Sequence, residues 1–260
     1  MINSKEVLKK IIRKTCSTQL QHRLRKYYLV RRILKNVYRK EKEIVALESI
    51  INIGDQVADI GANVGEYTIK LSSLVGKEGQ VYSFEPIWGN YNILEAVVQN
   101  ACLSNVRLFK QALGYKSGKQ NMVIPDMEGF DGFAWAHFIQ HSEPGKIETV
   151  DVFTIDELWD EKVFERLDFI KCDVEGAELE VILGGLRFLK VLHPCLLIEI
   201  SKKNSEAVFE LLKKLGYRVF VYDVNLIETK EYLNKRFSNY FFFHPKSEKW
   251  KLKMSKLDLI

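Results

Sequence analysis

The sequence predicts a doubly wound α/β fold with a mostly parallel, seven-stranded sheet, helices on both of its faces and a helical arm at the N-terminus. The sheet is predicted because short apolar runs alternate with segments of helical periodicity from residue 56 onward. Glycine or proline follows most of these segments, as expected at the ends of strands and helices. The arm is predicted because residues 1–50 contain neither glycine nor proline. Hydrophobic residues make up 47% of the chain, which is enough for a substantial core.

The N-terminal arm, residues 1–50, combines helical spacing with strong positive charge. Its apolar side chains recur at Leu20, Leu24 and Tyr27, which predicts one or two amphipathic helices. Residues 1–42 hold 14 Lys or Arg and two Glu, a net charge of +12, so the remainder of a chain of net charge +5 carries −7. The arm is either a solvated helix, a packing element or a peripheral contact for anionic membrane. Nucleic acid is disfavoured because the remainder is acidic.

The rest of the chain, residues 51–260, is predicted to be one domain. We expect strands at 56–60, 79–86, 106–114, 167–173, 194–200, 217–223 and 239–245. We expect helices at 65–76, 88–101, 176–185 and 205–216. Residues 115–153 interrupt the alternation as an insert. It holds two further strand-like runs and, between them, a long loop rich in aromatic residues, glycine and histidine, as loops over a site often are.

The segment DIGANVGEYT, residues 59–68, joins the first predicted strand to the helix that follows it. Asn63 and Glu66 stand where a nicotinamide fingerprint beginning at Gly61 requires glycine, and no P-loop motif is present. An acid before the turn, Asp59, would repel a pyrophosphate but suits a ligand with an amino group and a sulfonium charge, such as S-adenosylmethionine. The residues expected to bind it are Asp59, Gly61, Asn63, Gly65 and Thr68. A tight turn without a ligand is the alternative.

Two further strand ends are placed to line the same crevice. Glu85 ends the second predicted strand, 20 residues after Gly65, where acids in doubly wound folds bind ribose hydroxyls. Gln111 and Ala112 lie near the end of the third strand and are expected to approach the adenine by position alone. For Glu85 the alternative is an exposed glutamate with no ligand.

Four stretches, taken in order, resemble the FkbM family of class I methyltransferases. They are VADIGANVGEYT, VYSFEP, VRLFKQALG and LDFIKCDVEGAELEVILGG, followed by LLIEI. The resemblance covers about residues 50–220, and its most specific parts are G-A-N-x-G and K-x-D-x-E-G-A-E. It implies a Rossmann-like domain that uses S-adenosylmethionine, mostly for O-methylation of sugar hydroxyls on glycans or natural products. The arm and the insert match no family pattern, so the acceptor is expected only as a class, a hydroxyl-bearing small molecule or glycan.

The acids of DVEGAE, residues 173–178, follow the fourth predicted strand at the sheet edge where ligands bind in such folds. We expect Asp173 beside the sulfonium or amino end of the cofactor, with Lys171 paired to it. Glu175 is expected to take the proton of the acceptor hydroxyl or to bind the acceptor. Glu178 is expected to complement the helix dipole. Capping of the following helix is the alternative for Asp173 and Glu175.

Three other polar residues are weaker candidates for the site. Glu199 ends the fifth predicted strand and would face the same crevice. His137 and His141 lie in the insert, where each is a candidate base or metal ligand, although packing and surface roles are commoner for such residues. A divalent metal ion on Asp173 and Glu175 is compatible with oxygen ligands, but no ligand spacing in the sequence requires one.

Two other functions compete with methyl transfer. One is a nicotinamide oxidoreductase, which Asn63 and Glu66 disfavour. The other is a non-catalytic adaptor that keeps the cofactor fold and attaches to membrane or glycan through the arm. The four cysteines form no C-x-x-C pair, and no long apolar run or secretory signal is evident, so a cytoplasmic location, at most peripheral at the membrane, is expected. The oligomeric state is not predicted.

Overall fold

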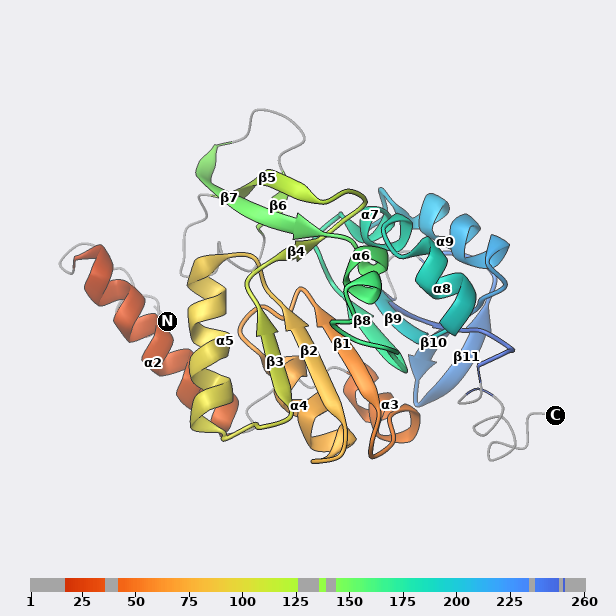
Figure 1. Ribbon diagram of the computed structural model, residues 1–260, viewed down its shortest axis with the longest axis horizontal. Coiled ribbons are helices and arrows are strands. Elements are labelled where there is room, and N and C mark those ends of the chain that lie inside the picture. The colour runs from red at the N-terminus through yellow and green to blue at the C-terminus, as the bar shows by residue number, and fades with distance from the viewer. Residues whose placement is uncertain are drawn as a thin grey trace, which may run out of the picture.

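The described part of the N-terminal arm forms two helices that pack on the body of the protein. The computed structural model describes residues 17–35, 42–125, 136–138, 144–233, 237–247 and 250. The arm helices are α2 (Thr18–Leu34) and α3 (Lys42–Ile50). Ser17 caps α2 because its side chain accepts a hydrogen bond from the backbone N–H of Leu20. Figure 1 shows α2 lying beside α5, so this helix of the basic arm packs against the body.

The main sheet has eight strands in the order β11-β10-β12-β9-β8-β1-β2-β3. They are β1 (Gln56–Ile60), β2 (Gln80–Phe84), β3 (Val106–Phe109), β8 (Phe169–Cys172), β9 (Cys195–Glu199), β10 (Arg218–Asp223), β11 (Asn225–Thr229) and β12 (Asn239–Phe243). The neighbouring strands β9, β8, β1, β2 and β3 are parallel to one another. Strand β12 runs antiparallel to both of its neighbours, β9 and β10. The predicted strand count of seven is wrong by one. The extra edge strand, β11, buries none of its residues and therefore carries no apolar signal.

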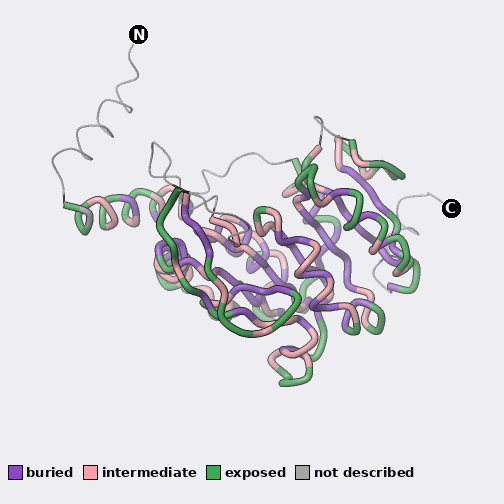
Figure 2. Tube along the Cα trace, turned by 90° about the horizontal axis from the view of Figure 1, so that it is seen from above, coloured by how far each residue is buried: buried purple, intermediate pink, exposed green. Residues whose placement is uncertain are grey.

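Helices cover both faces of this sheet, as predicted. They are α4 (Glu66–Val75), α5 (Trp88–Asn100), α6 (Ile155–Asp160), α7 (Glu178–Leu183), α8 (Leu186–Leu192) and α9 (Ser205–Lys214). One apolar core joins the sheet to α6 through α9, and another joins its opposite face to α3 and α4. Strand β12 shows why its sequence is continuously apolar: Tyr240 and Phe242 enter the first core, whereas Phe241 and Phe243 enter the second. Figure 2 shows these buried segments running through the middle of the molecule.

Two short helices, α6 and α8, were not predicted from the spacing of apolar residues. Helix α6 begins with a capping box in which Thr154 and Glu157 satisfy each other's backbone N–H groups. The predicted helix 176–185 is shorter at both ends, and a separate helix, α8, follows it directly. The break lies at Gly184, where a Cβ atom would come within 2.0 Å of the carbonyl oxygen of Gly114.

A second sheet of four strands lies over the carboxyl ends of the main strands (Figure 1). Its strands are β4 (Ala112–Leu113), β5 (Gly118–Pro125), β6 (His137–Phe138) and β7 (Gly145–Phe153), in the order β4-β7-β5-β6. The predicted third strand is therefore divided, since β3 ends at Phe109 and the chain then crosses to the second sheet. The two extra strands of the insert are confirmed. Most of the loop between them lies outside the described residues, but β6 is a strand, not loop.

Two of the three described cysteines are buried. Cys172 and Cys195 are buried in β8 and β9, and Cys102 is exposed, whereas Cys16 lies outside the described residues. Within the described part of the chain, no helix is both long and apolar enough to cross a membrane.

Candidate active site

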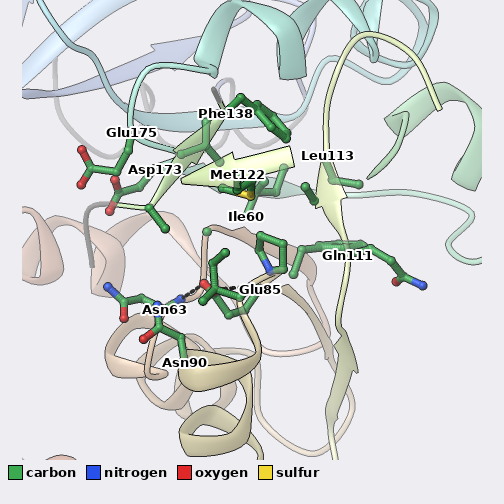
Figure 3. A pocket seen from close by; sticks show the side chains of 17 residues that line it. Ile60, Asn63, Glu85, Asn90, Gln111, Leu113, Met122, Phe138, Asp173 and Glu175 are labelled. Carbon is green, nitrogen blue, oxygen red and sulfur yellow. Dashed lines mark hydrogen bonds between the residues drawn. The ribbon is translucent and has the colours of Figure 1, made fainter. Parts of the chain in front are cut away.

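A narrow cleft opens at the carboxyl ends of β1, β2 and β8, below the second sheet (Figure 3). Strand order reverses at β1, and such a switch point is where open α/β sheets bind ligands. The empty space of the cleft is about 610 Å³, part of it open to solvent. The predicted site residues that line it are Gly61, Asn63, Glu85, Gln111, Ala112, Asp173 and Glu175.

The glycine turn between β1 and α4 has three residues in the left-handed region, Gly61, Asn63 and Gly65, at φ angles of 76°, 51° and 95°. A Cβ atom on Gly61 would lie 1.8 Å from the carbonyl oxygen of Asp173. The sequence suggested that glycine is needed here for close approach of a ligand. The structure shows that Gly61 also leaves space for the backbone of Asp173. The turn between β1 and α4 therefore packs directly against the backbone of the segment that follows β8.

Asp59 and Thr68 lie behind the cleft and do not line it. Asp59 is fully buried, and the Thr68 hydroxyl donates to its Oδ2 at 2.6 Å. The Thr68 hydroxyl also lies 3.1 Å from that of Ser83, a buried residue of β2 that the sequence analysis did not single out. Burial raises the pKa of Asp59, although Lys171 and Thr68 oppose the rise. Because Asp59 and Thr68 do not line the cleft, the geometry does not support direct contact with the cofactor. We infer that they stabilise the turn between β1 and α4.

Glu85 lies in the floor of the cleft and is 4% exposed. Its carboxylate accepts hydrogen bonds from the backbone N–H groups of Asn63 at 2.9 Å and Ile87 at 3.0 Å (Figure 3). Burial nevertheless raises the pKa of Glu85 to about 8, against the opposing effect of Ile87, Asn63 and the Asn90 side chain. A carboxylate with lone pairs left over at this strand end can accept the two hydroxyls of a ribose.

Asn90 connects this carboxylate to the N-terminal helix, a link that no sequence motif indicated. Asn90 is buried in the first turn of α5 and lines the cleft. Its side-chain oxygen accepts a hydrogen bond from Arg25 of α2 at 3.0 Å, and Arg25 also donates to the carbonyl of Gly89 at 3.3 Å. Arg25 is only 8% exposed. A buried cation from the arm thus orients a side chain that contacts Glu85.

Lys171 is paired with Asp173, as the alternation of residues predicted. The ammonium nitrogen lies 3.0 Å from Asp173 Oδ2 and 3.9 Å from Asp59 Oδ1. It also lies 4.7 Å from the centre of the Tyr67 ring. Burial by itself would lower the pKa of Lys171, but the carboxylates of Asp173 and Asp59 outweigh it and raise that pKa. Lys171 therefore stays charged and fixes Asp173 at the edge of the cleft.

Glu175 stands at the mouth of the cleft with a backbone φ of 49°. Local burial of its carboxylate and the nearby charge of Asp173 raise the pKa of Glu175 to about 7, and His137 is among the charges that oppose the rise. Asp173 and Glu175 do not cap α7, because its N-cap residue is Ala177 and no side chain forms a capping hydrogen bond there. Figure 3 shows Glu175 and Asp173 side by side at the rim.

Glu178 begins α7, as expected, but it does more than complement the helix dipole. It is 1% exposed, accepts a hydrogen bond from the backbone N–H of Gly176 at 2.7 Å, and is held by Asn204 at 3.2 Å. Asn204 also donates to the carbonyl of Gly176. These bonds fix the loop that carries Glu175, and Asn204 was not identified from the sequence.

The opposite wall of the cleft is apolar and comes largely from the second sheet. Met122 of β5, Phe138 of β6 and Leu113 of β4 form it. Ala112 is buried there, whereas Figure 3 shows the Gln111 side chain directed away from Glu85. Gln111 therefore contributes through its place on the chain and not through its amide. A flat apolar wall facing a carboxylate is suited to an adenosine.

The structure adds little support for a role of the two histidines, of Glu199 or of a metal ion in the site. His137 lies close enough to Glu175 to influence its pKa, and His141 lies outside the described residues. Glu199 is half-buried at the end of β9 and acts electrostatically on Lys171. In the part of the chain that the structure describes, no three His, Cys, Asp or Glu side chains are grouped as metal ligands would be.

The side chains that line the cleft fit S-adenosylmethionine better than a dinucleotide. They include Glu85, Asp173 and Glu175, and among the described lining residues none is lysine or arginine. A pyrophosphate would find no cationic partner there, whereas a sulfonium or an ammonium can interact with the acidic side chains.

Comparison with known proteins agrees with this assignment. The family profile of the methyltransferase FkbM domain matches residues 59–219, more than half of the chain. The solved structure of a methyltransferase FkbM from Methylobacillus flagellatus KT is similar with a TM-score of 0.50 at 19% identity, over 73% of this chain and 43% of that one. This chain thus spans less than half the length of that protein. No curated protein sequence matches.

Two further solved structures are similar at a lower level. One is an S-adenosylmethionine-dependent O-methyltransferase from Thermotoga maritima, with a TM-score of 0.48 at 12% identity over 83% of this chain and 71% of that one. The other is a methyltransferase from Streptococcus mutans in complex with S-adenosylhomocysteine, with a TM-score of 0.46 at 14% identity over 79% and 96%. The match of the family profile carries the assignment: the chain belongs to the FkbM family of methyltransferases.

Proposed function

We propose that this chain transfers a methyl group from S-adenosylmethionine to a hydroxyl oxygen of a sugar, glycan or related metabolite. The observation that carries the proposal is the position and acidity of Glu175. Its carboxylate stands at the mouth of the cleft, and its pKa is raised to about 7. A hydroxyl is a weak nucleophile, and a base whose pKa lies near the working pH is the most effective at removing its proton.

The residues that would hold the cofactor occupy the two ends of the cleft. Glu85 would accept the ribose hydroxyls, and the apolar wall of Met122 and Phe138 would cover the adenine. Asp173, paired with Lys171 and oriented by it, would attract the charged end of the cofactor. S-adenosylmethionine supplies a methyl group on a positively charged sulfur, which is an electrophile.

Glu175 would act on the acceptor from the rim. It would accept the hydroxyl proton as the oxygen becomes nucleophilic, and its loop is held by Glu178 and Asn204. A base on a fixed loop gives the orientation on which transfer depends. Asp173 beside Glu175 offers further oxygens to a neighbouring hydroxyl, which supports an acceptor that carries several hydroxyls.

A methyl-transfer assay with labelled S-adenosylmethionine tests the proposal. The acceptors would be monosaccharides, oligosaccharides and glycan or lipid extracts, and the products would be labelled acceptor and S-adenosylhomocysteine. We expect transfer to a hydroxyl that is lost in Glu175→Gln and retained in Glu210→Gln, an exposed glutamate of α9. Comparison of glycans and lipids from cells with and without the gene by mass spectrometry would identify the natural acceptor.

Two results would contradict the proposal. Methylation of a nitrogen or carbon atom would show that the acceptor class is wrong. Cofactor binding without any turnover, together with partner binding that survives Glu85→Gln, would favour the non-catalytic adaptor instead.

A further inference from the structure

Helix α2 has two apolar faces, and only one of them is used in the fold. On the inner face Val30 is 8% exposed and Ile33 is 1% exposed, and both pack with residues of α5 such as Ile93 and Val97. A helix on the surface of a globular protein normally needs one such stripe and presents polar side chains on the other side. The outer face of α2 departs from this pattern.

The outer stripe of α2 is defined by seven exposed residues with helical spacing. They are Leu20, Arg23, Leu24, Tyr27, Tyr28, Arg31 and Lys35. The two leucines are 43% and 39% exposed and the two tyrosines 61% and 60%. Steps of three, four and seven residues place all of them along one side of the helix. The stripe is therefore a continuous surface of aliphatic, aromatic and cationic side chains, not a scatter of single exposed residues.

The cations of the outer stripe are arranged differently from those of the inner side. On the inner side, Lys26 donates to Asn92 at 2.6 Å and Arg32 pairs with Glu66. On the outer stripe, no described carboxylate forms an ion pair with Arg23, Arg31 or Lys35. Helix α2 contains no Asp or Glu. The positive charge of the stripe is therefore available to an external anionic surface.

The aromatic residues of the stripe are of the kind that sits at the boundary of a bilayer. The guanidinium of Arg31 lies 5.2 Å from the centre of the Tyr27 ring and donates to its hydroxyl. Tyrosine and tryptophan place an apolar ring and a polar group at headgroup depth, and the long stem of arginine reaches the phosphates. Trp88 of α5 is 52% exposed and lines a groove together with Leu20, which extends the stripe by one more interfacial residue.

We propose that the outer stripe of α2 docks this protein on an anionic membrane surface, with the helix lying in the plane of the headgroups. Charge complementarity supports an anionic membrane as the occupant, because residues 1–42 have a net charge of +12 and helix α2 contains no Asp or Glu. The acidic body would be repelled by the same membrane, so contact is confined to the arm. The inference is independent of the acceptor that the active site uses.

The expected binding is weak, reversible and sensitive to salt. Three lysine or arginine side chains near an anionic bilayer should raise the affinity about a hundredfold. The leucines and tyrosines add the burial of apolar surface. The electrostatic part decays within a Debye length, about 8 Å at physiological ionic strength.

Vesicle flotation of the full chain tests the proposal. We expect binding to phosphatidylcholine vesicles that contain phosphatidylglycerol, little binding to phosphatidylcholine alone, and release by salt. Leu24→Ser combined with Tyr28→Ser, and separately Arg23→Gln combined with Arg31→Gln, should each abolish flotation. The matched controls are Val224→Ser with Ile227→Ser at the β10–β11 hairpin, and Lys190→Gln with Lys214→Gln on α8 and α9, which should float like the wild type.

Calorimetric titration with S-adenosylhomocysteine should give the same affinity for every variant, which establishes that loss of flotation is not loss of the fold. The proposal is overturned if the wild type fails to float or floats equally with neutral vesicles. It is also overturned if the two α2 variants float like their controls. A change from oligomer to monomer in the α2 variants on light scattering, without vesicle binding by the wild type, would make the stripe a contact between copies. Retention on RNA alone would make it a nucleic-acid surface.

Discussion

Asp173 depends on a single buried cation for its position, since Lys171 reaches it at 3.0 Å and is itself 4% exposed. We expect Asp173→Asn to keep the fold but to lower the rate of methyl transfer about a hundredfold, the scale of losing one fixed electrostatic group at a reacting centre. Steady-state kinetics would measure the loss. Asp151→Asn on the exposed side of β7 is the control. Normal turnover by Asp173→Asn would remove Asp173 from the catalytic site.

Glu175 makes the activity dependent on pH near neutrality. Because burial raises its pKa to about 7, a growing fraction is protonated below that pH and cannot accept a proton from the acceptor. The rate should therefore rise with pH through about 7 and level off above it. In Glu175→Gln the rate should fall by about 10²–10⁴-fold and lose this rise. A wild-type profile that is flat from acid to alkaline pH would contradict the role of Glu175 as the base.

Helices α2 and α5 meet at Arg25, which connects the arm to the floor of the cleft. Arg25→Met would leave the buried Gly89 carbonyl and the Asn90 side chain without their donor, at a cost of about 1–3 kcal/mol for such a group. We expect the affinity for S-adenosylhomocysteine to fall about tenfold, because Asn90 would no longer be held against Glu85. Titration calorimetry would measure it, with Lys26→Met as control. A lower melting temperature with unchanged affinity would mean that Arg25 only joins the two helices.

The turn between β1 and α4 is constrained by the segment after β8 as well as by its own backbone. An alanine at position 61 would take a φ of 76°, costing about 1–2 kcal/mol, and its Cβ would also collide with the Asp173 carbonyl at 1.8 Å. Gly54→Ala is the matched control, because Gly54 has a φ of 86° but no atom within 4 Å of a Cβ. Urea denaturation should show a clearly larger loss of unfolding free energy for Gly61→Ala. Equal losses would mean that the contact with Asp173 relaxes at no cost.

The buried carboxylate of Glu85 affects the stability of the whole molecule. Its pKa is raised from 4.5 to about 8, so between those values the folded protein holds a proton that the unfolded chain releases. This contribution to the free energy of unfolding is complete below about 4.5 and is lost as pH rises to about 8, with a slope of up to about 1.4 kcal/mol per pH unit. Glu85→Gln lacks it. The stability of that variant relative to the wild type should increase with pH across this window.

Urea denaturation of both proteins at several pH values would test this expectation, and parallel stability curves would contradict it. The same variant should bind S-adenosylhomocysteine more weakly, because an amide offers one acceptor oxygen to the ribose hydroxyls where the carboxyl group offers two. Stability and cofactor binding would then change in opposite directions, as they often do at functional sites.

The order of strands and helices, the turn at residues 59–68 and the acids at the strand ends were determined by the sequence alone. These features depend on periodicity and on turn residues, which act between neighbours along the chain. The family assignment followed from the same short motifs and agrees with the match over residues 59–219. Edge strand β11 was missed because it buries nothing, and α6 was missed although its capping box, Thr154 and Glu157, is visible in the sequence.

Only the tertiary structure decided which distant residues meet. Strand β8 lies beside β1 with Lys171 opposite Asp59, and this register puts one buried ammonium between two carboxylates. The contact between Arg25 and Asn90 joins segments 65 residues apart and has no local signal. Asp59 could be placed at the end of a strand from the sequence, but not behind the cleft. Local pattern specifies what each segment is, whereas distances between segments follow from how the whole core packs.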